Sequence, residues 1–234
     1  GEEAGAPVEP EQPEPVGPNE DGDFVAFTPE SQKDPEGVAQ VKPANPAVVS
    51  VKNNAELTGG AEGAPAAGTS YYATFDTSRS GFALEGLNWD ISNVLDKNNP
   101  GGVQYQLDVW IWIEDISKVS NFVVRTYSDE LKDTNGSLIE LWHWQWNSSK
   151  DIDDTQPGVQ KLQTGWNHLV RNVETLDTKG APTVLDTISF HEHADGMNYS
   201  FAVASVALNQ IGVDDGKTYP LVGLDDQCDL PVFL

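Results

Sequence analysis

Residues 138–146 read Leu138-Ile139-Glu140-Leu141-Trp142-His143-Trp144-Gln145-Trp146. Side chains of a β-strand alternate between its two faces, so the three tryptophans share one face of this stretch and Leu141, His143 and Gln145 share the other. Aromatic residues are favoured in strands, where they pack on a pleated surface. The stretch therefore predicts a β-strand with a row of indoles along one side.

Two more stretches have the same aromatic character. Residues 103–113 alternate an apolar set with a set of aromatic and acidic residues, namely Leu107, Val109, Ile111 and Ile113 against Asp108, Trp110, Trp112 and Glu114. Residues 165–170 read Gly165-Trp166-Asn167-His168-Leu169-Val170. Six of the 7 tryptophans thus lie on three expected strands, which points to a β-protein whose sheets carry aromatic faces.

The remainder of the chain continues this pattern. Strand-like stretches lie at 47–51, 70–75, 81–87, 121–127, 160–162, 185–191 and 199–208, and turn residues such as Asn135-Gly136 separate them. We find no helical period of useful length. The spacing predicts one all-β domain over residues 44–212, built as an antiparallel sandwich.

The order of these elements resembles the galactose-binding-like β-sandwich superfamily, which includes non-catalytic carbohydrate-binding modules and discoidin-like domains. The resemblance covers about residues 44–212, and its most specific part is the segment Leu162-Gln163-Thr164-Gly165-Trp166-Asn167-His168-Leu169. It implies an antiparallel jelly-roll β-sandwich. Many members hold a structural calcium with paired aspartates on the last strand, but this chain has Ala204-Ser205 there, which weakens that inference.

The two ends of the chain differ from the middle. Residues 1–43 are rich in proline and glutamate and are expected to form an extended acidic linker or stalk, because such a composition buries too little apolar surface to fold. Residues 213–234 are expected to form a C-terminal tail that either folds back or contacts a neighbouring subunit. The lack of an initiator Met suggests a piece of a longer protein.

Charge and composition exclude some partners. The formal net charge is -24, with 37 acidic against 13 basic residues, which would repel phosphate backbones and anionic lipids. Nucleic-acid binding is therefore disfavoured, and no apolar stretch is long enough to insert into a membrane. Cys228 is the single cysteine, so no internal disulfide forms. We expect an extracellular or cell-surface location.

Glycan binding needs a flat aromatic surface for the apolar face of a sugar ring and planar polar groups for its hydroxyls. The predicted ligand-binding residues are Trp110, Trp112, Trp142, Trp144, Gln145, Trp146 and Asn147. The sequence does not decide which strand face points outward. If the indole row of 138–146 packs inward, the candidates become His143 and Gln145, with Tyr127 and Trp89 as the aromatic partners.

Metal binding and catalysis have weaker signals. Candidate calcium ligands are Asp76, Asp151 and Asp153, since calcium prefers carboxylate oxygens. His191 and His193 share a strand face and could chelate a transition metal, but no third ligand is evident nearby. Cys228 lies among acidic residues that disfavour its thiolate, and no nucleophile motif occurs. We therefore expect no enzymatic activity.

The function predicted is a non-catalytic carbohydrate-binding module of a secreted or surface-displayed protein, which binds glycan by aromatic stacking. An alternative is a structural or adhesive subunit of a cell-surface or virion fibre. A third interpretation is an accessory domain of a glycan-degrading enzyme.

Overall fold

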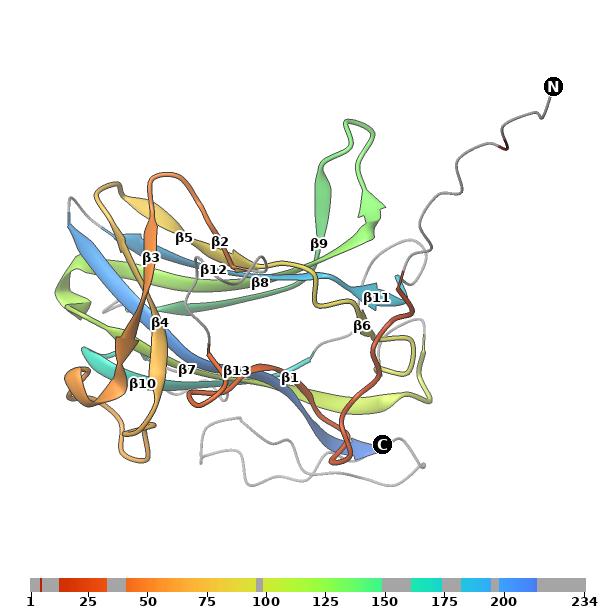
Figure 1. Cartoon of the computed structure of the whole chain (residues 1–234), viewed down its shortest axis with the longest axis horizontal. Helices are drawn as coiled ribbons and strands as arrows, with labels where there is room; N and C mark the ends of the chain where they lie inside the picture. Colours follow the sequence, from red (N-terminus) through yellow and green to blue (C-terminus); the bar gives the residue numbers. More distant parts are fainter. Residues whose placement is uncertain are drawn as a thin grey trace.

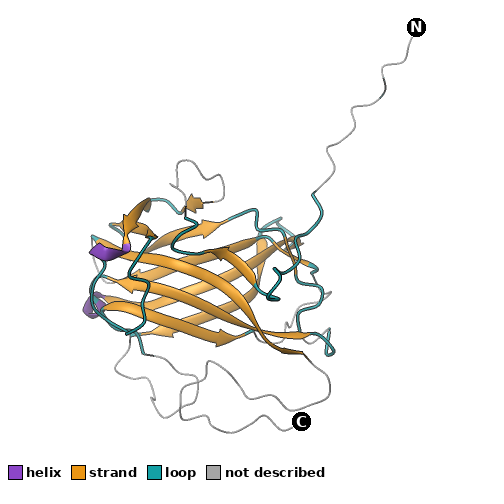
Figure 2. Cartoon of the chain, turned by 60° about the horizontal axis from the view of Figure 1, so that its bottom comes forward, coloured by secondary structure: helices purple, strands orange, loops and turns teal. Residues whose placement is uncertain are grey.

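The computed structural model describes residues 5, 13–32, 41–95, 99–148, 161–173, 182–194 and 198–213. Within these ranges the chain consists of strands, loops and two short 3₁₀ turns, η2 (Asn54–Glu56) and η3 (Ile116–Lys118). Two antiparallel sheets face one another (Figures 1 and 2). The predicted all-β antiparallel sandwich is confirmed.

Sheet I has the order β10-β7-β13-β4-β3, and β1 also pairs with β13. Its strands are β1 (Phe24–Phe27), β3 (Val48–Asn53), β4 (Thr69–Phe75), β7 (Val103–Ile113), β10 (Gly165–Asn172) and β13 (Tyr199–Val213). Sheet II has the order β2-β5-β12-β8-β9. Its strands are β2 (Val41–Pro43), β5 (Arg79–Leu84), β8 (Val119–Lys132), β9 (Leu138–Asn147) and β12 (Thr187–Ala194). A short pair, β6 (Trp89–Asp90) with β11 (Val184–Leu185), lies at one end (Figure 1).

The core lies between the inner faces of the two sheets, as period-two alternation requires. On β7 the inward set is fully buried, and on β12 and β13 large aromatic rings fill the centre. Phe82 of sheet II stacks on Phe201 of sheet I with ring centroids 6.0 Å apart. The same alternation places every second side chain of each strand on one of the two outer faces, where ligands can reach it.

The N-terminal boundary predicted for the folded domain is wrong. Residues 24–27 form β1 and residues 41–43 form β2, although both lie within the expected linker of residues 1–43. Phe24 and Phe27 are buried, and the Phe24 ring packs 5.3 Å from the ring of Trp89. The short Phe-Val-Ala-Phe stretch carries enough apolar surface to pack against the core and pair with β13, which the average composition of the acidic N-terminal segment conceals.

The β8–β9 hairpin bends out of sheet II, away from sheet I (Figure 1). Its register shifts between Arg125 and Tyr127 and again between Tyr127 and Lys132, and such bulges bend a strand. At the first shift the Thr126 hydroxyl accepts a hydrogen bond from the Trp142 backbone N–H (2.9 Å), in place of a ladder carbonyl. The turn contains Gly136 at a φ of 81°, in the predicted Asn-Gly pair.

Other expectations fall partly or wholly outside the described residues. The strand predicted at 160–162 is absent from residues 161 and 162, the part of it that the structure describes. Asp151, Asp153, Cys228 and residues 214–234 are not described. β13 ends at Val213, one residue beyond the predicted end of the domain.

Candidate functional site

The tryptophan row of β9 faces inward, which corrects its prediction as a ligand platform. Trp142, Trp144 and Trp146 are only 4%, 6% and 1% exposed. The opposite side of β9 carries His143 and Gln145, which are more polar, so burial of the indoles leaves the better-solvated groups outside. Gln145 is exposed and donates a hydrogen bond from Nε2 to Asn147 Oδ1 (2.9 Å).

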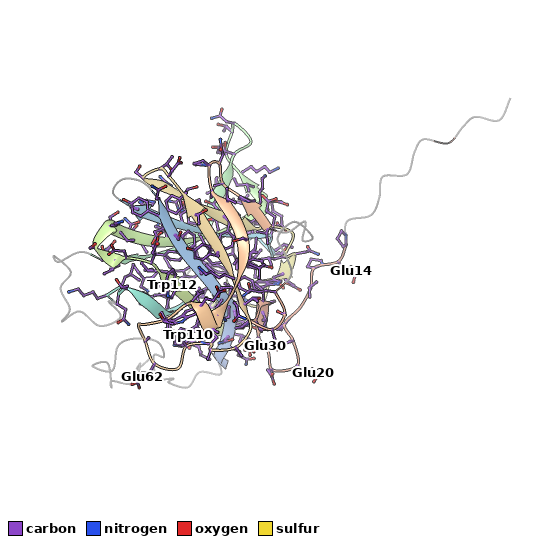
Figure 3. The ribbon with its side chains drawn as sticks, turned by 60° about the vertical axis from the view of Figure 1, so that its left-hand side comes forward. Glu14, Glu20, Glu30, Glu62, Trp110 and Trp112 are labelled. Atoms are coloured by element: carbon purple, nitrogen blue, oxygen red, sulfur yellow. The ribbon has the colours of Figure 1, made fainter. Side chains whose placement is uncertain are left out.

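Trp110 and Trp112 lie on the outer face of sheet I and are partly exposed (Figure 3). One ring face of Trp110 is already occupied, because His168 of β10 stacks on it with centroids 4.3 Å apart and planes 2° apart. His168 Nε2 lies 2.9 Å from Asp108 Oδ1, which fixes the imidazole over the indole. The predicted ligand residues are therefore divided between the core and the two outer faces.

Trp112 has a different partner. It opposes Ala202 of β13, and Ala202 in turn opposes Tyr72 of β4. Strands two positions apart are about 9–10 Å apart, yet the rings of Trp112 and Tyr72 lean over the small alanine until their centroids are 6.3 Å apart. The two rings form an aromatic pair on the outer face of sheet I, with Lys52 Nζ 4.4 Å from the centroid of Tyr72.

The loop between η2 and β4 holds two tryptophans of this face through hydrogen bonds. The Trp112 Nε1–H donates to the Thr58 carbonyl oxygen (3.0 Å), and the Trp166 Nε1–H donates to that of Leu57 (2.7 Å). The approach depends on glycine, since a Cβ on Gly60 would lie 2.2 Å from the Trp166 backbone nitrogen. The loop therefore holds the indoles in one orientation.

A hollow of about 490 Å³ lies one residue row beyond the aromatic pair. Ser200 opposes Thr74 and Thr74 opposes Val48, while the Glu114 backbone N–H donates to the Ser200 carbonyl oxygen (3.3 Å). Residues two apart on a strand are about 6.6–7 Å apart, so the hollow adjoins the Trp112–Tyr72 row. Its lining combines apolar walls with hydroxyl, amide and carboxylate groups: Pro46, Val48, Thr74, Phe75, Asp76, Glu114, Asn198, Tyr199 and Ser200.

The outer face of sheet II has a different chemistry. Three cross-strand rows run over β5, β12, β8 and β9, and they consist of Arg79-His193-Asn121-Asn147, Gly81-His191-Val123-Gln145 and Ala83-Ser189-Arg125-His143. We call the outward side chains of these rows the basic face. It contains His143 and Gln145, the ligand candidates predicted for the case in which the tryptophans of β9 face inward, and Tyr127 lies beside them. The fourth candidate of that case, Trp89, is buried at the end of the sandwich.

Charges on the basic face are partly compensated. Glu140 bridges two groups, with Oε1 3.1 Å from Arg125 Nε and Oε2 3.0 Å from His143 Nδ1. Burial, followed by the charges of Arg125 and Arg79, lowers the pKa of His191 to about 4. Burial and the same two arginines also lower the pKa of His193. Both imidazoles are therefore neutral near pH 7 and act as hydrogen-bonding groups.

Of the three predicted calcium ligands, only Asp76 lies in the part of the chain that the structure describes. No group of three or more His, Cys, Asp or Glu residues there could hold an ion. Asp76 lines the hollow of sheet I, and His191 and His193 share the basic face, while Glu192 between them points into the core. Calcium binding stays a prediction.

Sequence reasoning missed Tyr72, which completes the aromatic pair, and two residues that line the hollow. Tyr72, Thr74 and Ser200 belong to strands whose outward residues are small or polar and attracted no notice beside the tryptophans. The available signal was the pair Ser200 and Ala202 on the last strand, because two small outward residues on one strand leave space above the sheet. It becomes informative only with the register, which places β13 between β7 and β4.

Comparisons with known proteins give structural likenesses only. No family model and no curated protein matches the chain. A β-sandwich carbohydrate-binding module of promiscuous specificity is similar with a TM-score of 0.44 and 13% identity; the match covers 78% of this chain but 63%, under two thirds, of that one. The C-terminal family 22 carbohydrate-binding module of Clostridium thermocellum Xyn10B is similar with a TM-score of 0.43 and 15% identity, and the match covers 84% of this chain and 98% of that one. The family 11 module of Clostridium thermocellum, in complex with a mixed-linked tetrasaccharide, has a TM-score of 0.40 and 13% identity, with 80% of this chain and 95% of that one covered.

All three are carbohydrate-binding modules, the class that the sequence resemblance names. Likenesses at this level carry no argument about this chain's ligand, so any functional conclusion rests on its own residues. Among the described residues, no helix has the length and apolar character needed to cross a membrane.

Proposed function

We propose that the chain is the carbohydrate-binding module of a secreted or surface-displayed protein, and that it binds a neutral glycan on the outer face of sheet I without modifying it. The observation that carries the proposal is the Trp112–Tyr72 pair beside a hollow of about 490 Å³ with polar walls. A sugar ring requires both kinds of surface.

The two parts have separate roles. The aromatic pair offers an apolar platform for the C–H side of one sugar unit. The next unit lies in the hollow, where Ser200 and Asn198 supply hydroxyl and amide groups for hydrogen bonds with sugar hydroxyls. Asp76 and Glu114 can accept hydrogen bonds from hydroxyls but would repel an acidic sugar, so this site favours neutral polysaccharides.

The test is a titration of the full chain with soluble neutral polysaccharides of different backbones, followed by tryptophan fluorescence and isothermal calorimetry. At least one polymer should bind. Trp112→Ala should weaken binding about ten- to a hundredfold, because stacking buries apolar surface equivalent to about 1.5–3 kcal/mol. Tyr127→Ala on the opposite face is the matched control and should leave the affinity unchanged.

Two results would contradict the proposal: no binding to any polymer of the panel, or equal affinity of the wild type and the Trp112 variant. The absence of catalysis is checked separately. The polymer that binds should show no increase in reducing ends after long incubation with the protein.

A further inference from the structure

Arginine and imidazole side chains are concentrated on one face of a strongly acidic protein. The sequence contains 4 histidines and, counted along the chain, three arginines, Arg79, Arg125 and Arg171. Two of these arginines and three of the histidines lie on the basic face of sheet II. With a net charge of -24, such a concentration is not expected from solubility, which acidic residues already provide.

The strand register places Arg79 and Arg125 diagonally on either side of His191. Arg79 lies in the first row and Arg125 in the third, and His191 occupies the row between them. Their positive charges, after burial, lower the pKa of His191, in keeping with this diagonal placement. Gly81 and Val123, on either side of His191, add no polar group to this row.

Several polar groups on this face have unused hydrogen-bonding capacity. The Asn121 Oδ1, Ser189 Oγ and His193 Nε2 atoms have no hydrogen-bond partner among the described residues. Buried polar atoms are nearly always paired, so three unpaired atoms on one sheet face require an explanation. A bound molecule that carries hydroxyl groups would supply such partners.

We propose that the basic face is a second binding site, for a polysaccharide that contains carboxylate-bearing sugar units. A guanidinium group binds a carboxylate through two parallel hydrogen bonds, and neutral imidazole, amide and hydroxyl groups suit the hydroxyls of the same sugar ring. Glu140 occupies one side of Arg125, whereas Arg79 is exposed and forms no ion pair among the described residues. The ligand's carboxylate therefore binds first at Arg79, beside His191 and His193.

The overall charge sets a limit on the ligand. A polymer of high charge density is repelled by the rest of the protein, most strongly nucleic acid, with one negative charge per about 1.7 Å of duplex. At physiological salt this repulsion is screened beyond about 8 Å, whereas a partly buried contact is screened less. A polysaccharide with one carboxylate per sugar unit has a lower charge density than duplex DNA, so it gains the local contact at a smaller long-range cost.

The test compares an acidic polysaccharide with its uncharged ester and with two other polyanions. Polygalacturonate, its fully methyl-esterified form and a sulfated galactan are titrated against the full chain at 0.15 M salt, with single-stranded DNA as a further arm. Polygalacturonate should bind at least tenfold more tightly than its ester and than DNA. Tight binding of the sulfated galactan as well would identify sulfate as a second source of the same negative charge.

Variants then locate the contact. Arg79→Gln should weaken polygalacturonate binding about tenfold or more, as expected for a charge-assisted hydrogen bond. Lys42→Gln, which removes one positive charge from the edge strand of the same sheet, is the matched control and should have little effect. Trp112→Ala should leave this affinity unchanged, so that the second site is separated from the first.

Three outcomes would overturn the inference: equal binding of the acid and ester polymers, no loss in Arg79→Gln, or tighter binding of DNA than of polygalacturonate. Equal binding of acid and ester would still leave the neutral-glycan proposal intact, since that proposal depends on sheet I and on Trp112.

Discussion

Glu192 is the residue least expected in the interior of the sandwich. Its side chain is fully buried, and neither carboxyl oxygen has a hydrogen-bond partner among the described residues. Burial, and then the nearby Glu114 carboxylate, raise the pKa of Glu192 well above its ordinary value of 4.5. An uncharged carboxyl group is far less costly to bury than a carboxylate, so folded Glu192 keeps its proton at pH values where an exposed glutamate has already lost it.

This residue should make the stability depend on pH. The folded-state pKa is raised, so the stabilisation is complete below about pH 4.5 and is lost as the pH rises toward the folded-state pKa. In that window the free energy of unfolding falls by about 1.4 kcal/mol per pH unit on account of this group. Glu192→Gln cannot ionise, so urea denaturation from pH 5 to 8 should give it a flatter profile than the wild type. Parallel profiles would contradict the assignment.

His191 makes a prediction of opposite sign. Its pKa is lowered to about 4 by burial, then by Arg125, Arg79 and His193. The stability that its neutral form provides is present above pH 6.5 and lost as the pH falls toward 4. A histidine NMR titration should show His191 uncharged down to about pH 4, and Arg79→Gln should move its pKa upward. Lys42→Gln should leave it in place; an unchanged pKa in Arg79→Gln would show that the arginine's potential does not reach the imidazole.

Strand β1 makes the predicted linker part of the folded domain. Phe24 packs between Trp89 and Tyr105, with centroid distances of 5.3 and 5.4 Å. Phe24→Ala should lower the free energy of unfolding by about 3–5 kcal/mol, the usual cost of such a truncation in a core. Val25→Ala, at a position 41% exposed on the same strand, should cost little. Equal effects in chemical denaturation would show that β1 contributes no core packing.

The loop over sheet I can be tested through two of its glycines. Gly60 and Gly63 both have positive φ, 84° and 80°, so alanine is strained to a similar degree at either position. Only at Gly60 would the new Cβ meet the backbone of Trp166, since no atom lies within 4 Å at Gly63. Gly60→Ala should therefore destabilise the fold by about 1 kcal/mol more than Gly63→Ala, and it should also weaken neutral-glycan binding because the loop holds Trp112. Thermal unfolding and fluorescence titration of both variants measure the difference.

The sequence predicts a strand well where its alternate side chains differ strongly in polarity. Residues 103–113 were predicted as a strand with the bounds that the structure shows, because their two faces differ strongly in polarity. The same comparison applied to β9 would have placed Trp142, Trp144 and Trp146 inside, since His143 and Gln145 on the other face are more polar. The ligand-binding prediction for these three tryptophans requires the opposite orientation, and it left the outward face of the strand undecided. The hollow could not be predicted, because it requires β13 to lie between β7 and β4, and that register depends on long-range pairing.

At the scale of the whole molecule, the sandwich separates two surfaces of contrasting charge. Asp76 and Glu114 give the hollow of sheet I an acidic lining, whereas Arg79 and Arg125 give sheet II a basic face. The packed core between the sheets keeps the two faces apart, and stacked sheets are about 10 Å from each other. A ligand on one face therefore neither contacts nor excludes a ligand on the other.

One domain should accordingly hold two different polymers at once. With a neutral polysaccharide immobilised on a support, the wild-type chain should capture fluorescent polygalacturonate from solution. Trp112→Ala should abolish capture because the protein no longer attaches to the support, and Arg79→Gln should abolish it although the protein attaches normally. The amount of attached protein, measured by antibody, distinguishes these two failures. Competition between the soluble forms of the two polymers would show that they share a single face, since two independent sites on opposite sides of a rigid core cannot compete.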